Sequence, residues 1–170
     1  MGVIGAVWGF IGVSLVLGSA IYRMFDMAQG LFSAELTWYQ WAALIGNVFF
    51  MAYSEGYKAF QLGFSPRVAA RLRYLKENPA PLLVVLAPLF CLGFFHATKK
   101  RKIITYSLIT GLVLLIIAVR MLPHPWRGII DVGVVVGLGW GLISFWLFCI
   151  KAFTSEHFPY SPEVVEETKG

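Results

Sequence analysis

Charged side chains are scarce in this chain of 170 residues, because Asp, Glu, Lys and Arg make up only 14% of it while 58% is hydrophobic. A soluble domain of this length needs a charged coat over its core, so the composition argues against a soluble fold. The mean hydropathy is +0.73, and the few charges gather in short clusters between long apolar stretches. We therefore expect an all-α fold, a polytopic helical bundle integral to a membrane.

Cysteine and histidine are also rare, which bears on metal, haem and redox chemistry. The two cysteines, Cys91 and Cys149, lie in apolar stretches and form no CxxC pair, so we interpret them as packing residues. Of the three histidines only His96 is placed at membrane depth, whereas haem held between helices needs two axial ligands. No spacing typical of a zinc site is present, and we predict no metal and no cofactor.

Motifs of known enzymes are missing from the sequence as well. It contains no glycine-rich phosphate loop, no HExxH and no GxSxG, so we predict no catalytic residue and favour a non-enzymatic protein. The net charge of +5 could indicate nucleic acid, but the basic residues flank apolar stretches, where they orient a chain and contact anionic lipid. We therefore expect a lipid bilayer as a partner and no nucleic acid.

Long apolar stretches are what the sequence has in abundance. Four of them can cross a hydrocarbon core as helices, at a rise of about 1.5 Å per residue. They cover residues 3–22, 38–60, 103–122 and 129–150. A fifth stretch, residues 79–98, contains Pro79, Pro81 and Pro88, and we expect it to be either a short span or a re-entrant segment.

Two segments lie outside these stretches. Residues 65–78 combine an apolar face with basic side chains, which predicts an amphipathic helix on the membrane surface, capped by Ser65 and ended by Asn78 before Pro79. Residues 152–170 form a polar, acidic tail that we expect to be disordered or draped over the surface. Residues 1–151 are thus expected to form a single transmembrane domain.

The basic residues distinguish two topologies. If all five stretches cross, the basic residues divide equally between the two sides, which gives no orienting bias. If residues 79–98 turn back near Pro88, only Arg23, Arg120 and Arg127 lie outside, and both termini are cytoplasmic. We favour this re-entrant topology, in the plasma (inner) membrane if the source is prokaryotic. The headgroup-binding residues are then expected to be Arg67, Arg71, Lys76, Lys99, Lys100, Arg101 and Lys102.

A polar stripe follows the second predicted span. Its members recur every seven residues and are joined by two charged neighbours: Gln40, Asn47, Ser54 and Gln61, with Glu55 and Lys58. One interpretation is hydrogen bonding between packed helices. The other is the lining of a narrow polar path, with Asn47 near mid-membrane and Glu55 or Lys58 near one mouth.

A second polar cluster surrounds the turn before the last predicted span. Asp131 lies near a helix start, close in sequence to Arg120, His124 and Arg127. An ion pair that closes the turn is the first interpretation, and an anion site the alternative.

Small residues spaced four apart indicate close helix packing. Gly5 and Gly9 lie in the first span, and Gly133, Gly137 and Gly141 in the last, so we expect these two helices to be partners.

Together these features favour an accessory or scaffold component of a membrane assembly, as a homo-oligomer or with a partner subunit. A small oligomeric transporter or channel is the alternative, with its path along the second helix. A third hypothesis is an intramembrane enzyme or lipid-headgroup binder that uses the cluster around Asp131.

Overall fold

The chain folds into helices, and the computed structural model describes residues 1–32, 35–94, 99–155 and 157–164. Within these ranges the side chains at 27, 32, 99–102, 108, 109 and 112 are not described. The all-α class is as expected from the composition. The elements are α1 (Gly2–Phe32), α2 (Trp38–Met51), η1 (Ala52–Phe64), α3 (Ser65–Glu77), α4 (Pro81–Val85), α5 (Ala87–Leu92), α6 (Lys99–Arg120) and α7 (Trp126–Thr154).

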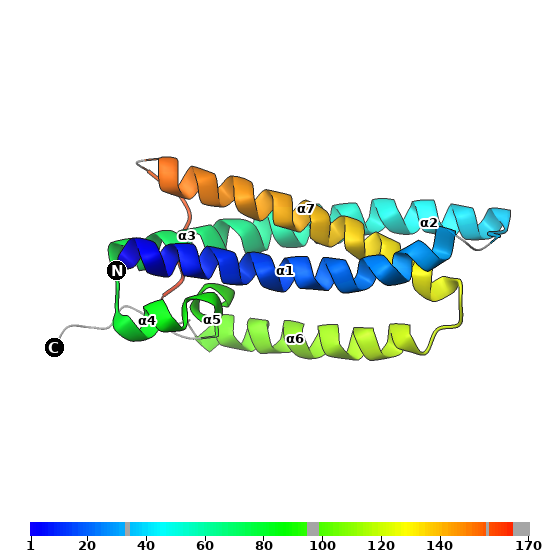
Figure 1. Cartoon of the computed structure of the whole chain (residues 1–170), viewed down its shortest axis with the longest axis horizontal. Helices are drawn as coiled ribbons and strands as arrows, with labels where there is room; N and C mark the ends of the chain where they lie inside the picture. The colour runs from blue at the N-terminus through cyan, green and yellow to red at the C-terminus, as the bar shows by residue number, and fades with distance from the viewer. Residues whose placement is uncertain (33–34, 95–98, 156, 165–170) are drawn as a thin grey trace.

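Four long rods run roughly along one axis (Figure 1). We call the end that holds the N-terminus, the end of α3, α4, α5 and the end of α7 the proximal end. The opposite, distal end holds the end of α1, the start of α2 and the turn from α6 to α7. The chain thus runs out along α1, back along α2 to α3, out along α6 and back along α7.

The second rod is one uninterrupted helix from Trp38 to Glu77, made of α2, η1 and α3. The predicted boundary at Ser65 is wrong, because Phe64 before it already has helical dihedrals (φ −73°, ψ −55°) and Ser65 continues them. Ser65 therefore caps nothing, and its buried hydroxyl has no hydrogen-bond partner among the described residues. The predicted end is confirmed, since Asn78 leaves the helical region just before Pro79.

The middle of this rod, η1, is a π-helix of 13 residues. At its end the backbone N–H of Ser65 donates to the carbonyl of Phe60, five residues back. Most π-helices are single turns, and they are frequent at functional sites. The wider winding brings every fourth or fifth residue to the same side, and here that side faces α7.

The helix α3 lies in the core and not on the surface, which corrects the expectation of a surface helix at residues 65–78. Ala69, Leu72 and Leu75 are fully buried. They join one hydrophobic cluster with Val13 of α1, Phe90 of α5 and Phe145 and Cys149 of α7. The predicted apolar face packs into this cluster. On the basic face Arg71 is buried under α5 and the tail, while Lys76 and Glu77 near the end of the helix stay exposed.

The described part of the proline-rich stretch, residues 79–94, contains two short helices at the proximal end (Figure 1). Pro81 and Pro88 stand in the first turns of α4 and α5, where the missing N–H costs no hydrogen bond. The break falls at Leu86, and Gly93 ends α5 with φ +92°, a left-handed conformation that glycine adopts without strain. Residues 95–98, and with them His96, lie outside the described residues.

Two helices in the described residues, α1 over Gly2–Leu31 and α7, are long and apolar enough to cross a membrane. The core helix of a soluble protein can have the same length and apolar composition. The change of winding at Met51 divides the second rod, which leaves α2 with 14 residues.

Candidate functional site

Two members of the polar stripe hold the second rod against α7. The amide nitrogen of Asn47 donates to the carbonyl of Ile129 at 2.7 Å. The side-chain oxygen of Gln61 accepts a hydrogen bond from the indole of Trp140 at 2.8 Å. Each hydrogen bond joins residues about eighty positions apart in the sequence. The two amides therefore fix the position of the second rod along α7.

The other two members bond within their own helix. Gln40 accepts from the backbone N–H of Thr37 at 2.9 Å and completes a capping box at the start of α2. Ser54 donates to the carbonyl of Phe50, four residues earlier, at 2.7 Å. The geometry of the stripe therefore fits helix packing and capping more closely than the lining of an open path.

The glycines of α7 form the surface on which the second rod rests. Asn47 lies against Gly133, Glu55 against Gly137 and the ring of Phe60 against Gly141. A β-carbon added at Gly137 would lie 3.1 Å from the Glu55 carboxylate, and one at Gly141 2.5 Å from the Phe60 ring. The expected contact between the first and last helices is present, but this ladder does not make it, because its glycines face α2 and η1.

The glycines of α1 meet a different set of helices. Gly5 lies against Val84 of α4, and Gly9 against Leu72 of α3 and Cys91 of α5. The contacts of α1 with α7 are made by larger side chains. Phe10 and Phe145 stack with ring centroids 5.4 Å apart, and Trp146 donates to Ser14 at 3.2 Å.

The depths of the polar groups differ from the expectation. Asn47 meets Ile129 near the distal start of α7, so it does not lie midway along the bundle. Glu55 meets Gly137 and Gln61 meets Trp140, which are near the middle of α7. Glu55 and Gln61 thus lie near the middle of the bundle axis, and Asn47 lies toward the distal end.

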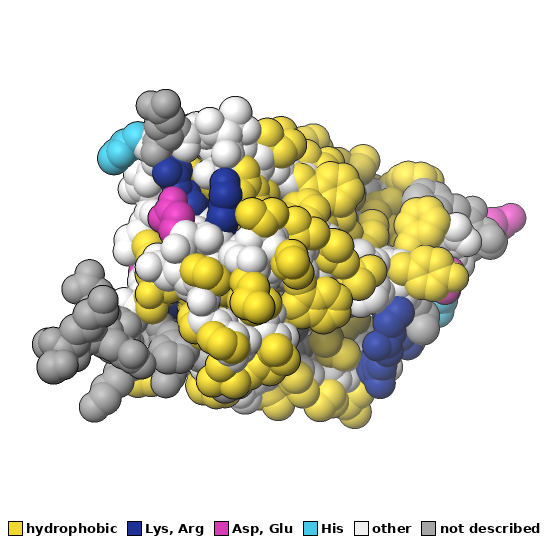
Figure 2. All heavy atoms as spheres, turned by 60° about the vertical axis from the view of Figure 1, so that its left-hand side comes forward, with side chains coloured by type: hydrophobic (Ala, Val, Ile, Leu, Met, Phe, Trp, Pro, Cys, Tyr) yellow, Lys and Arg dark blue, Asp and Glu magenta, His cyan; other side chains and the backbone are white. Residues whose placement is uncertain are grey.

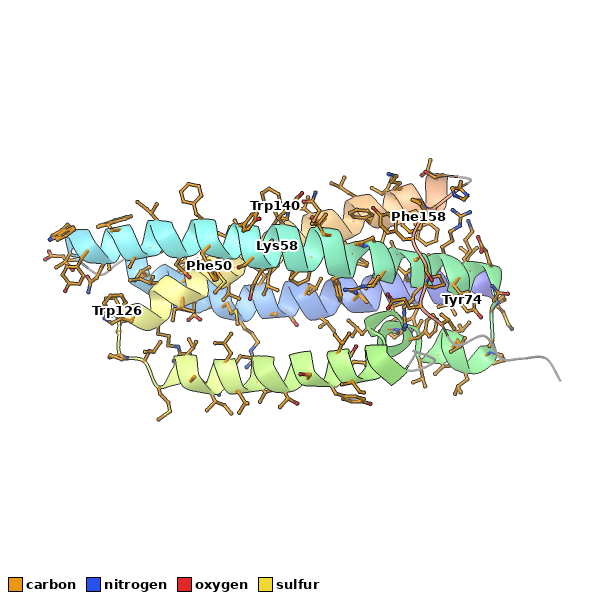
Figure 3. The ribbon with its side chains drawn as sticks, turned by 180° about the vertical axis from the view of Figure 1, so that it is seen from behind. Phe50, Lys58, Tyr74, Trp126, Trp140 and Phe158 are labelled. Carbon is orange, nitrogen blue, oxygen red and sulfur yellow. The ribbon has the colours of Figure 1, made fainter. Side chains whose placement is uncertain are left out.

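Glu55 and Lys58 do not pair with each other. Lys58 is exposed, and its amine lies over the ring of Tyr53, 5.0 Å from the centroid. Tyr53 in turn stacks on Tyr57 at 6.0 Å. Figure 3 shows Lys58 near the middle of the long axis, with Phe50 and Trp140 nearby. We call the exposed side chains around this lysine the Lys58 face: Phe50, Tyr53, Tyr57, Lys58 and Leu62.

The cluster before α7 is assembled only in part. Arg127 Nε lies 3.7 Å from Asp131 Oδ2, one helical turn away, and Asp131 is only 6% exposed. Arg120 and His124 are exposed, and neither contacts this pair. The ion pair that closes the turn is therefore present, whereas the four residues of the predicted anion site are not brought together.

Arg71, predicted to bind lipid headgroups, is buried and only 3% exposed. Its guanidinium donates to the carbonyls of Phe90 at 2.7 Å, Pro162 at 2.9 Å and Glu163 at 3.2 Å. The first carbonyl belongs to α5 and the other two to the tail. The prediction is corrected because a long-range contact, invisible in the local pattern, brings the tail over α3.

The other predicted headgroup residues vary in their surroundings. Lys76 is exposed with its amine 5.5 Å from the ring centroid of Phe153, while Arg67 is half-buried. The side chains of Lys99, Lys100, Arg101 and Lys102 lie outside the described part of the chain.

A small pocket lies between α3 and the tail at the proximal end, with a volume of about 210 Å³. It is lined by Arg73, Tyr74 and Glu77 of α3 and by His157, Phe158 and Tyr160 of the tail, among others. Sequence reasoning missed this site. The available signal was the aromatic content of residues 157–160, which is unusual for a solvated tail.

No family model, no curated protein and no solved structure matches this chain. The geometry of the molecule is therefore the basis for assigning its role. Among the described residues, no group of His, Cys, Asp and Glu side chains is arranged to hold a metal ion.

Proposed function

We propose that this chain is an integral membrane scaffold, a non-enzymatic subunit that holds a partner at the Lys58 face. In this proposal α1, the second rod, α6 and α7 cross the bilayer, while α4 and α5 enter from the proximal side and return to it. Figure 2 supports a bilayer setting, since hydrophobic side chains cover the middle of the face shown and charged ones lie toward its ends.

The positions of the chain ends support the orientation. The N-terminus, the end of α7 and the break between α4 and α5 lie at the proximal end (Figure 1). The basic residues near that end include Arg71, Arg73 and Lys76, and the backbone of Lys99–Lys102 begins α6 there. Basic loops favour the cytoplasmic side, so the proximal end is the cytoplasmic one in this proposal.

The exposure of Lys58 at mid-depth is the observation that carries the proposal. A lysine that faced lipid at the centre of a bilayer would cost about 2.5–3.5 kcal/mol on insertion scales. Its neighbours Phe50 and Leu62 are exposed and apolar, so the face is otherwise suited to lipid or to another helix. A partner that covers this face and supplies an acceptor for the amine removes the cost.

Cysteine cross-linking in native membranes tests this proposal. Leu62 on the Lys58 face and Leu114 on α6 are 60% and 62% exposed, so Leu62→Cys and Leu114→Cys form a matched pair. We expect a bifunctional thiol reagent to link Leu62→Cys to a partner, and Leu114→Cys to remain uncoupled. Lys58→Glu should abolish the link while Lys58→Arg keeps it. Equal coupling at both positions, or none at either, would overturn the proposal.

A transporter or channel is the second candidate, and the unusual winding of η1 favours it. Glu55 and Lys58 are ionisable residues at mid-depth on a π-helix, a combination common in ion and proton pathways. This candidate predicts flux in liposomes that Glu55→Gln abolishes and Ser54→Ala leaves unchanged. Absence of flux in vesicles that contain correctly folded protein would remove it.

A further inference from the structure

Three aromatic rings line the pocket between α3 and the tail, beside polar groups. Tyr74 comes from α3, and Phe158 and Tyr160 come from the tail. The rings of Phe158 and Tyr160 are 5.2 Å apart and tilted by 54°. Tyr74 and Phe158 both lie toward the proximal end (Figure 3). Aromatic rings gathered around one small space are the kind of lining that can attract a cation.

Contacts behind the pocket hold these rings in place. Tyr160 meets Phe148 of α7 edge to face, with centroids 5.7 Å apart, and Tyr74 meets Phe90 of α5 at 6.2 Å. The tail itself is bound through the Arg71 hydrogen bonds to Pro162 and Glu163. The pocket is therefore largely formed before any ligand enters, which lowers the entropic cost of binding.

The two charged groups at the pocket pair with each other. Arg73 Nε donates to Glu77 Oε1 at 2.9 Å, and Arg73 Nη1 donates to the carbonyl of Ser155 at 2.8 Å. The ion pair leaves the pocket without a net positive charge that would repel a cation. Glu77 is 55% exposed and its second oxygen accepts no hydrogen bond from any described residue, so this oxygen can accept one from a ligand.

We propose that this pocket binds an organic ammonium group of the choline or ethanolamine type. The ammonium lies against the rings of Tyr74, Phe158 and Tyr160 and interacts with the Glu77 carboxylate. A volume of about 210 Å³ is below the range of about 300–1,000 Å³ typical of larger ligands, and it suits a group of this size. His157 lines the same space and provides a polar contact for the remainder of the molecule.

The ammonium group has two sources, a phospholipid headgroup or a free amine. The headgroup source rests on the proposed function, because it needs the proximal end to lie at the bilayer surface. The chemistry of the pocket itself does not depend on the crossings. The two sources can therefore be separated by probes that differ only in their acyl chains.

Binding of choline chloride and of dihexanoyl phosphatidylcholine to the full chain in detergent tests the pocket by calorimetry. Glu77→Gln and Tyr160→Leu should each weaken binding of both probes about tenfold, since a cation–π or charge contact contributes about 1–2 kcal/mol. Glu35→Gln and Tyr22→Leu change exposed residues outside the pocket and should bind as the wild type does. Tyr160→Phe keeps the ring and should also bind normally, which separates ring loss from misfolding.

Each outcome decides one point. Equal affinity for choline and the lipid probe assigns the free amine, and at least tenfold tighter binding of the lipid assigns the headgroup. Failure of both probes to bind the folded wild type overturns the inference, as does equal weakening in the control variants. Uncoupled Leu62→Cys with intact choline binding would overturn the proposed scaffold and leave this pocket standing.

Discussion

In a water-soluble fold, a basic helix such as α3 is expected at the surface and an apolar helix such as α6 in the core. In this molecule the two positions are reversed. α3 contains Arg67, Arg71, Arg73 and Lys76, yet it lies at the centre of the main hydrophobic cluster. α6 is apolar along most of its length, yet Ile103, Leu114 and Ile117 are all more than half exposed. A helix with four basic residues among thirteen is thus among the best buried, and a helix with a long apolar segment stands at the periphery (Figure 1).

Basic residues of α3 can lie beside a hydrophobic cluster because they find hydrogen-bond acceptors there. Arg71 and Arg73 are placed where helix ends and the tail present carbonyls that need donors, at Phe90, Pro162 and Ser155. In α6, residues 111–119 offer only apolar side chains, and its ring contact, between Tyr106 and Phe94, lies in its first half. Lipid can cover such a helix as well as protein can, whereas lipid cannot satisfy a carbonyl.

Matched leucine truncations give the largest expected difference between the two helices. Leu72 of α3 is 0% exposed and Leu114 of α6 is 62% exposed. Leu72→Ala should lower the free energy of unfolding by about 3 kcal/mol, because it leaves a cavity in the core. Leu114→Ala should change it by less than about 0.5 kcal/mol. Thermal unfolding in detergent measures both, and equal losses would show that α6 is packed as tightly as α3.

Replacing Arg71 tests whether its hydrogen bonds hold this basic side chain in the core. Arg71→Met keeps much of the side-chain volume and removes the donors to Phe90, Pro162 and Glu163, so stability should fall by about 2–3 kcal/mol. Limited proteolysis should then cleave the tail first, because two of the three bonds hold it. Arg23→Met changes an exposed arginine and serves as the control. A tail that stays protected in Arg71→Met would remove the role given to this residue.

Much of the helical plan could be read from local sequence. Asn78 before Pro79 predicted the end of α3, and the prolines at 79, 81 and 88 predicted an interrupted segment, which the structure forms as α4 and α5. The glycine spacing of α7 predicted a close helix contact. These signals depend only on residues close in sequence, so tertiary contacts do not change what they predict.

The partners of those elements could not be read in the same way. Ser65-Pro66 is typical of a helix start, but here the chain is already helical before Pro66, because η1 continues into α3 without a break. The burial of Arg71 depends on Pro162, which is 91 residues away. The aromatic pocket needs the same long-range docking of the tail. Periodicity predicts a face, and only tertiary contacts decide what covers it.

A single helix, α7, also has a packed side and an unpacked side. Substitutions at two of its glycines compare these sides directly. A β-carbon at Gly141 would lie 2.5 Å from the Phe60 ring, whereas one at Gly139 would meet nothing within 4 Å. Gly141→Leu should therefore lower stability by about 2 kcal/mol through overpacking, and Gly139→Leu should leave it unchanged or slightly raised, because leucine favours the helix. Both variants add the same side chain, so only the neighbour differs. If the two lost stability equally, the second rod would not rest on the glycine face of α7, and the mid-depth position of Lys58 would lose its support.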